Sequence, residues 1–165
     1  MNKDAFWTLI EERPAAGDDC NEQAAAVMER LSELPASDIL DFQRYIDECR
    51  VEAYRWDLWA VAYIINGGCS DDGFEYFRGW LIAQGRSYFE AALQQPERAA
   101  ERTEPGVCEY ECEDILFGAR QIYQRVTGTA MPATGVLLPH DPRGTPWTEE
   151  DLPRLYPALH ERYCA

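Results

Sequence analysis

A group of four charged side chains near the middle of the chain has the composition to bind a small polar ligand or a cation. The group consists of Asp71, Asp72, Glu75 and Arg78. Carboxylates are the ligands that hard cations such as Mg²⁺ prefer, and a guanidinium group binds carboxylate or phosphate through paired hydrogen bonds. The residues therefore suit two kinds of chemistry, cation binding by the acids and anion binding by Arg78.

The four charges fall on a predicted helix. Ser70 is a good N-cap, and Asp71 and Asp72 suit the first turn, where negative charge complements the helix dipole. At about 100° per residue, Arg78 and Asp71 fall inside the apolar stripe of this helix, with Glu75 at its edge. A buried arginine is costly unless it is paired, so we expect Arg78 to be partly buried and bonded to Asp71 or Glu75. Asp72 lies on the opposite face and is expected to be exposed.

Asp57 is a fifth candidate, on the preceding helical pattern. It stands between Trp56 and Leu58, on the apolar side. We expect Asp57 to face Arg78 across the two helices, because a paired charge in the core fixes the register of neighbouring helices. The alternative to a ligand-binding or cation-binding site is that Asp71 and Asp72 only cap a helix and that Arg78 forms a structural ion pair. The residues alone leave both explanations open.

Several short motifs in the first part of the chain are those of a known family. They are Phe6-Trp7 and Leu9-Ile10, then Asp57-Leu58-Trp59, Gly67-Gly68, Ser70-Asp71-Asp72, Phe74, Phe77-Arg78, Trp80-Leu81-Ile82 and Gly85-Arg86. Together they resemble the bacterial "domain of unknown function 4240" family. The resemblance covers residues 1–93 well and the remainder loosely. It implies a bacterial, cytoplasmic, helical protein, and it implies no activity that can be carried over.

Composition and charge restrict the class of partner. The chain has 165 residues, of which 46% are hydrophobic and 12% aromatic, so we expect a single folded domain with a real core. Its formal net charge of −15 disfavours nucleic acid and anionic membranes, which need a basic surface. A protein partner is the more natural expectation on charge. Since the chain lacks a signal-peptide start and a long apolar run, we expect a cytoplasmic location and no membrane span.

Hydrophobic periodicity predicts an all-α fold, a single-domain bundle of about six to eight helices. The longest pattern runs over residues 37–65, with Arg50 and Asp57 in the centre of its apolar side, and we expect a kink within residues 50–56. Its heptad-like seam leaves open whether the protein is a monomer or a homodimer. A later helix is predicted over residues 108–127. Residues 131–147 hold four prolines and two glycines, so they are expected to be irregular.

Details of that irregular segment and the turn after it are also predictable. Its apolar residues 136–138 are expected to lie in a groove between helices. His140 stands beside Asp141 and is expected to be a solvated turn residue. Thr148 and Asp151 have the spacing of a capping box that starts a helix.

The cysteines are predicted to be free thiols, because disulfides are rare in proteins that are not exported. They are Cys20, Cys49, Cys69, Cys108, Cys112 and Cys164. Cys108 and Cys112 would share one face of a helix, but a structural zinc site needs two further ligands and no matching pair is present, so no metal is expected. Cys69 precedes an N-cap, where the helix dipole would lower its pKa. A redox-responsive thiol is therefore a third hypothesis.

The leading functional hypothesis is a non-catalytic binding or protein-interaction domain, with no cofactor. It rests on the helical core, the acidic composition, and the absence from the sequence of a phosphate-binding glycine loop, a nucleophile elbow or a His-Glu-x-x-His motif. The alternative is a cation-dependent enzyme or an anionic-ligand-binding protein that uses Asp71, Asp72, Glu75 and Arg78, with Asp57 as a further candidate. That alternative predicts a pocket where residues 66–78 meet another helix.

Overall fold

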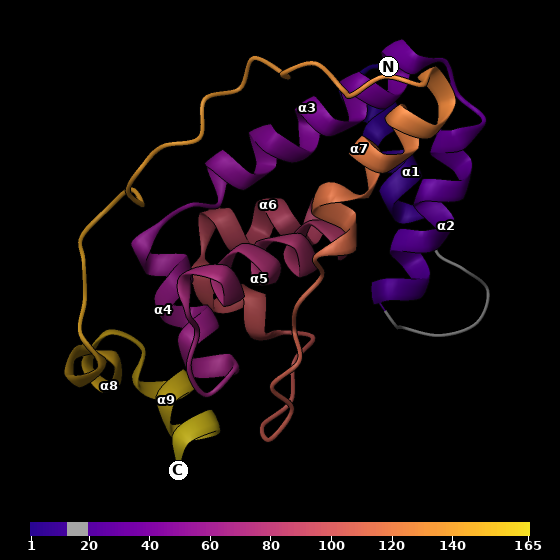
Figure 1. Ribbon diagram of the computed structural model, residues 1–165. Coiled ribbons are helices and arrows are strands. Elements are labelled where there is room, and N and C mark those ends of the chain that lie inside the picture. Colours follow the sequence, from indigo (N-terminus) through magenta and orange to yellow (C-terminus); the bar gives the residue numbers. More distant parts are fainter. Residues whose placement is uncertain (13–19) are drawn as a thin grey trace.

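The computed structural model describes residues 1–12 and 20–165, and this part of the chain is all-α (Figure 1). The α-helices among the described residues are α1 Lys3–Glu11, α2 Cys20–Ser32, α3 Ala36–Glu52, α4 Trp56–Ile65, α5 Asp71–Ala83, α6 Arg86–Gln94, α7 Asp114–Thr127, α8 Leu152–Leu155 and α9 Pro157–Cys164. Two 3-10 helices are η1 Pro96–Ala100 and η2 Glu149–Asp151. The all-α prediction is confirmed, with slightly more helices than expected. The sequence also predicts a linker over residues 14–19, which contain Pro14 and Gly17, and this segment lies outside the described residues.

Helix α5 is the central element and contacts most of the other helices. It packs against α1, α2, α3, α4, α6 and α7. The Ser70 hydroxyl accepts a hydrogen bond from the Gly73 N–H at 3.1 Å, which satisfies one of the free donors of the first turn. Phe74, Phe77 and Leu81 are fully buried. The predicted cap and apolar stripe are both confirmed.

The long pattern over residues 37–65 forms two helices. Helix α3 ends at Glu52 and α4 begins at Trp56, inside the interval where a kink was expected. The backbone between them hydrogen bonds with a distant segment: the Arg143 N–H donates to the Tyr54 carbonyl at 3.0 Å, and the Trp56 N–H donates to the Arg143 carbonyl at 2.9 Å. The helix is interrupted here because these backbone groups bind Arg143 rather than their own helix.

The helix predicted over residues 108–127 begins only at Asp114. Residues 108–113 are not helical, so Cys108 and Cys112 do not share a helix face and that expectation was wrong. The Cys112 N–H donates to the Tyr76 carbonyl of α5 at 2.9 Å. Contacts with α5 therefore replace the first turns of the expected helix.

Residues 128–148, called the strap below, connect α7 to η2 without forming a helix, as expected. Figure 1 shows the strap passing along the outside of the molecule beside α3. Thr134 attaches it to α3, since its hydroxyl donates to an Asp47 carboxylate oxygen at 2.7 Å. The expectation that residues 136–138 lie in a groove was wrong for Leu137, which is 89% exposed, whereas Leu138 lines a pocket between α3 and α5. His140 is solvated, as expected, and Thr148 and Asp151 form the predicted capping box.

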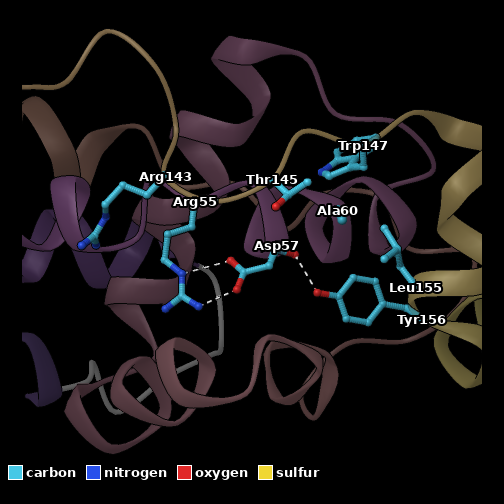
Figure 2. A pocket seen from close by; sticks show the side chains of 9 residues that line it. Arg55, Asp57, Ala60, Arg143, Thr145, Trp147, Leu155 and Tyr156 are labelled. Atoms are coloured by element: carbon cyan, nitrogen blue, oxygen red, sulfur yellow. Dashed lines mark hydrogen bonds and ion pairs between the residues drawn. The ribbon is translucent and has the colours of Figure 1, made fainter.

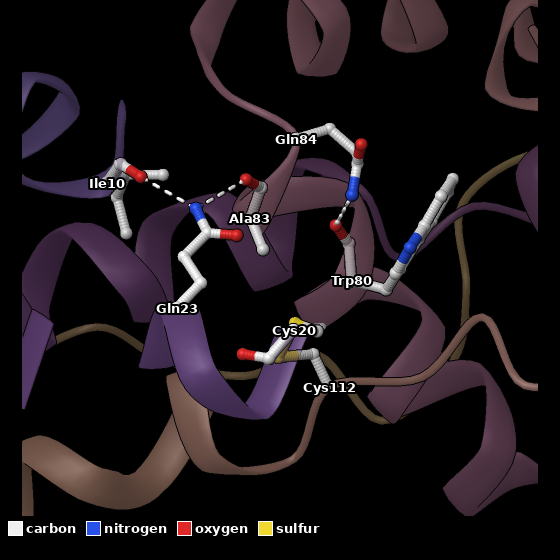
Figure 3. The surroundings of a disulfide bond; sticks show 7 residues. All are labelled: Ile10, Cys20, Gln23, Trp80, Ala83, Gln84 and Cys112. Carbon is white, nitrogen blue, oxygen red and sulfur yellow. Dashed lines mark hydrogen bonds between the residues drawn. A yellow bond between two sulfur atoms is a disulfide. The ribbon is translucent and has the colours of Figure 1, made fainter. Parts of the chain in front are cut away.

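A disulfide joins Cys20, at the start of α2, to Cys112, just before α7 (Figure 3). The prediction of free thiols was therefore wrong for this pair. That prediction rested on the compartment alone, whereas the fold brings these two residues together from 92 positions apart. The other four cysteines are free thiols.

Thiol labelling will test this arrangement. Burial raises the pKa of Cys69 to about 12, the opposite of the shift that the redox hypothesis requires, and it also raises the pKa of Cys49. Cys108 and Cys164 are exposed. Near pH 8 without reductant, we expect Cys108 and Cys164 to react rapidly with an aromatic disulfide reagent. Cys49 and Cys69 should react only on unfolding, because the thiolate is the nucleophile and their raised pKa values keep them as thiols. Rapid labelling of Cys69 in the native protein would contradict this.

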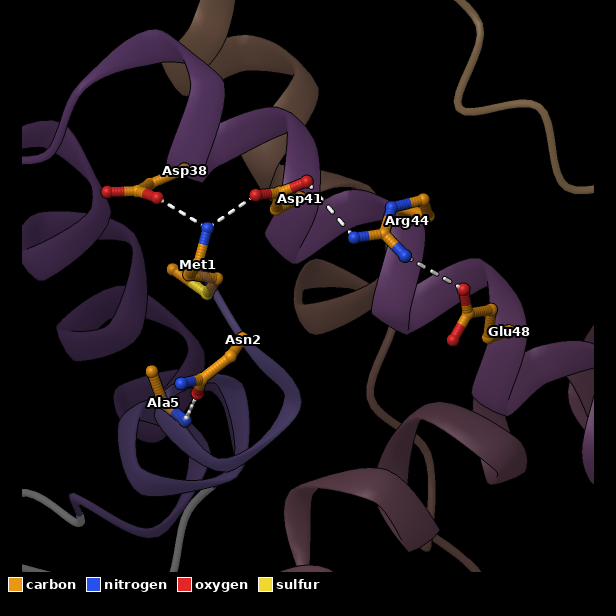
Figure 4. A network of polar contacts seen from close by, with 7 residues as sticks. All are labelled: Met1, Asn2, Ala5, Asp38, Asp41, Arg44 and Glu48. Carbon is orange, nitrogen blue, oxygen red and sulfur yellow. Dashed lines mark hydrogen bonds and ion pairs between the residues drawn. The ribbon is translucent and has the colours of Figure 1, made fainter.

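The N-terminal ammonium group joins α1 to α3 (Figure 4). It donates to Asp38 at 2.5 Å and to Asp41, and Arg44 links Asp41 to Glu48. The hydrogen bond from this ammonium group is the main reason that the pKa of Asp41 lies below its ordinary value. Among the described residues, no helix has both the length and the apolar character needed to cross a membrane.

Candidate functional site

Four of the five candidate residues line one small cavity between α3, α5 and the strap, called the α3–α5 pocket. Its volume is about 160 Å³. The lining residues are Arg50, Tyr54, Asp71, Asp72, Glu75, Arg78, Leu138 and Pro139. The pocket lies where residues 66–78 meet another helix, as the ligand-binding hypothesis predicts. This volume suits small ligands only.

Both Nη atoms of Arg50 bind carboxylates, while its buried Nε has no hydrogen-bond partner among the described residues. Arg50 is only 6% exposed. One of its Nη atoms donates to Asp47 at 3.0 Å, and the other forms an ion pair with Glu75. Asp47 is also buried and accepts hydrogen bonds from Gln43 at 3.1 Å and from Thr134 of the strap at 2.7 Å. This network connects α3, α5 and the strap, and it neutralises the charge of Arg50.

Arg78 is equally buried, at 6% exposed, but it is not paired in the same way. Its Nη1 donates to the Arg50 carbonyl at 2.9 Å and its Nε to the Phe74 carbonyl at 3.3 Å. Its guanidinium carbon lies 4.5 Å from the Tyr54 ring centroid and 5.0 Å from that of Phe74. Within the described part of the chain, Arg78 forms no ion pair. The burial prediction is confirmed, and the predicted bond to Asp71 or Glu75 was wrong, because Glu75 binds Arg50.

The electrostatics follow from this arrangement. The pKa of Arg78 is lowered to about 10, mainly by burial and also by the neighbouring charge of Arg50, while Glu75 and Asp71 act in the opposite direction. Burial also raises the pKa of Tyr54. The guanidinium group thus stays protonated at neutral pH while it lacks a contacting counter-ion. An anionic group in the pocket would supply one.

Asp71 and Asp72 lie at the outer edge of the pocket, in the first turn of α5, and both are exposed. The predicted exposure of Asp72 is confirmed. No ion pair of either residue with another described residue is present. Among the described residues, no group of three or more His, Cys, Asp or Glu side chains is placed to hold a metal ion. The pocket therefore has acids at its rim and an arginine at its base.

Asp57 does not face Arg78, so that prediction was wrong. Its carboxylate binds Arg55, with Nε–Oδ1 at 3.0 Å and Nη2–Oδ2 at 2.5 Å. It lines a different and larger cavity, shown in Figure 2. The interruption between α3 and α4 changes the helical phase, so Asp57 leaves the face on which Arg50 lies.

Helical spacing placed Arg50 on the buried face but did not reveal its partners Asp47 and Glu75. One signal was present in the sequence: Asp47 and Arg50 are three residues apart, the spacing of a helix ion pair. No local pattern indicated Tyr54, because it reaches the pocket from the interruption between two helices. Leu138 and Pro139 arrive from the strap, far along the chain.

The fold and the pocket together define an all-α domain with a small polar pocket beside its central helix. Residues 1–125 match the family described as "Protein of unknown function (DUF4240)", and the chain belongs to this family. The match extends well beyond the motifs in residues 1–93. It includes every side chain of the α3–α5 pocket except the two from the strap. No curated protein matches the chain. No solved structure matches it either.

Proposed function

We propose that this protein is a non-catalytic ligand-binding domain whose α3–α5 pocket takes a small molecule with an anionic group. One observation carries the proposal: Arg78 is buried beside a cavity and contacts no carboxylate among the described residues. A buried charge without a counter-ion costs free energy, and groups in such settings are concentrated at binding sites. A carboxylate or phosphate at Arg78 would form charge-assisted hydrogen bonds and offset that cost.

The rim of the pocket specifies the other end of the ligand. Asp71 and Asp72 are exposed carboxylates at the mouth of the same cavity. A cationic group there would be attracted by both. The ligand class that matches the two ends is a small zwitterion, such as an α-amino acid, with its carboxylate toward Arg78 and its ammonium group toward the rim. The volume of about 160 Å³ suits a molecule of that size.

A thermal-shift titration tests this function. We expect an amino acid such as glutamate to raise the Tm, because a ligand that prefers the folded state stabilises it. The Arg78→Gln variant should lose the shift, and Asp72→Asn should reduce it. The matched control is Arg98→Gln, which removes an exposed arginine that pairs with Glu101 on the surface. The related acid and amine, each lacking one charge, should give smaller shifts.

Several results would oppose the proposal. An equal shift in Arg78→Gln would show that binding occurs elsewhere. A response to Mg²⁺ alone, lost in Asp72→Asn, would favour the cation-dependent alternative. No response to any zwitterion, small acid or inorganic phosphate would overturn it. A protein partner remains a prediction, and the exposed Leu137 and Leu138 on the strap are the side chains to test for it.

The bacterial origin and cytoplasmic location that the resemblance implies also remain predictions. The Cys20–Cys112 disulfide bears on the location, since disulfides persist mainly in oxidising compartments. The redox state of these two cysteines in rapidly quenched cells would test it, and a fully reduced pair would agree with a reducing compartment.

A further inference from the structure

A second cavity, separate from the α3–α5 pocket, lies between the start of α4, the end of the strap and α8. Its volume is about 450 Å³, within the ordinary range of small-molecule sites. Figure 2 shows its polar centre: the Asp57 carboxylate, with Arg55 on one side and Tyr156 on the other. This Asp57 cavity shares no lining residue with the α3–α5 pocket, so its role is independent of the function proposed for Arg78.

The Arg55–Asp57 pair is held rigidly at the edge of the cavity. Besides its two bonds to Asp57, Arg55 donates to the Leu93 carbonyl at 2.6 Å. Asp57 also accepts from the Leu58 N–H at 2.7 Å, and its carbonyl accepts from the Tyr156 hydroxyl at 3.3 Å. A guanidinium group has five N–H donors and a carboxylate about four acceptor positions, so both retain unused capacity. The pair therefore presents donors and an acceptor side by side in a fixed geometry.

The other walls of the cavity combine one free hydroxyl with apolar surface. The Thr145 hydroxyl points toward Asp57 in Figure 2 and forms no hydrogen bond with another described residue. Trp147 and Tyr156 contribute aromatic rings, and Leu155 and Ala60 contribute aliphatic surface. The guanidinium group of Arg143 lies away from this centre in Figure 2 and donates to the Glu52 carbonyl at 2.9 Å.

We propose that the Asp57 cavity binds a ring that carries neighbouring hydroxyl groups, as in a sugar or in the ribose of a nucleoside. Each hydroxyl both donates and accepts, so a vicinal pair complements a carboxylate beside a guanidinium group. The carbon face of such a ring is apolar and suits the aromatic wall. The charges of Arg55 and Asp57 cancel, and the chain carries a net charge of −15, so a neutral ligand fits better than an anion.

Titration by NMR or calorimetry with methyl glucoside, adenosine and 2′-deoxyadenosine tests this proposal. We expect the wild-type protein to bind saturably, with a Kd in the millimolar range. The Thr145→Val variant should bind about fivefold more weakly, because it loses one hydrogen bond to the ligand without a change in the shape of the side chain. Binding of the glucoside identifies a free sugar as the ligand. Binding of adenosine but not of its deoxy analogue identifies the ribose.

The controls separate loss of binding from loss of folding. Thr145→Val removes no hydrogen bond within the described chain, so its Tm should equal that of the wild type. Asp57→Asn should weaken binding further, and Asp72→Asn, in the other pocket, should leave it unchanged. The proposal is overturned if none of the three compounds binds saturably. It is equally overturned if adenosine and its deoxy analogue bind alike while the glucoside does not.

Discussion

Gly79→Ala should lower the free energy of unfolding by about 3 kcal/mol and the Tm by roughly 6–12 °C. Gly79 lies where α5 crosses the segment that leads into α7. A methyl group added there would overlap the Cys112 carbonyl oxygen and would lie only 2.9 Å from Leu116 Cγ. The carbonyl belongs to the backbone, so the two segments must separate. Alanine is about 1 kcal/mol better than glycine in a helix, which is too little to compensate.

The matched control is Gly118→Ala in α7. The methyl group there would meet Met28, with Sδ at 2.8 Å and Cγ at 3.0 Å. Met28 is only half-buried and its unbranched side chain can move aside. We therefore expect a stability within about 1 kcal/mol of the wild type. Chemical denaturation of both variants checks the pair, and equal stability of the two would show that the α5–α7 crossing is not close-packed.

Local signals made α5 predictable from its own residues. Its cap, its acidic first turn and its apolar spacing all act within the helix itself. The four charged candidate residues in the range 71–78 accordingly all lie on α5. The depth of Arg78 followed from the same spacing. The pairing of Glu75 could not be predicted in this way. Glu75 binds Arg50 of α3 rather than Arg78, and that choice depends on where another helix lies.

The errors have a common physical cause, which is contact between distant segments. Residues 108–113 carry the acidic pattern of a helix start, yet they are not helical: the Cys112 N–H donates to the Tyr76 carbonyl, and the disulfide holds Cys112 against Cys20. Asp57 was placed on the face of Arg50 by counting along one continuous helix. Insertion of Arg143 between the two helices broke that count. Neither contact has a local sequence signal.

Loss of the Cys20–Cys112 disulfide should lower the free energy of unfolding by about 2–5 kcal/mol. The bond closes a loop between residues 92 positions apart, and long loops lose much of their entropy in the unfolded chain when they are closed. It also attaches the start of α2 to the segment that packs on Gly79. Cys20→Ser is the better variant, because it leaves Cys112 as a buried thiol, which behaves as a small apolar side chain.

Reduction provides an independent route to the same state. Wild-type protein in excess dithiol should unfold at the denaturant midpoint of Cys20→Ser, while the variant itself should not respond to the dithiol. Cys164→Ser, which removes an exposed free thiol, should match the wild type with and without reductant. A wild-type midpoint that does not change on reduction would show that the bond adds no stability. The paired cysteines would then need another explanation, such as a reversible response to oxidants. The rate at which dithiol reduces the disulfide in the native protein would show how readily the bond exchanges.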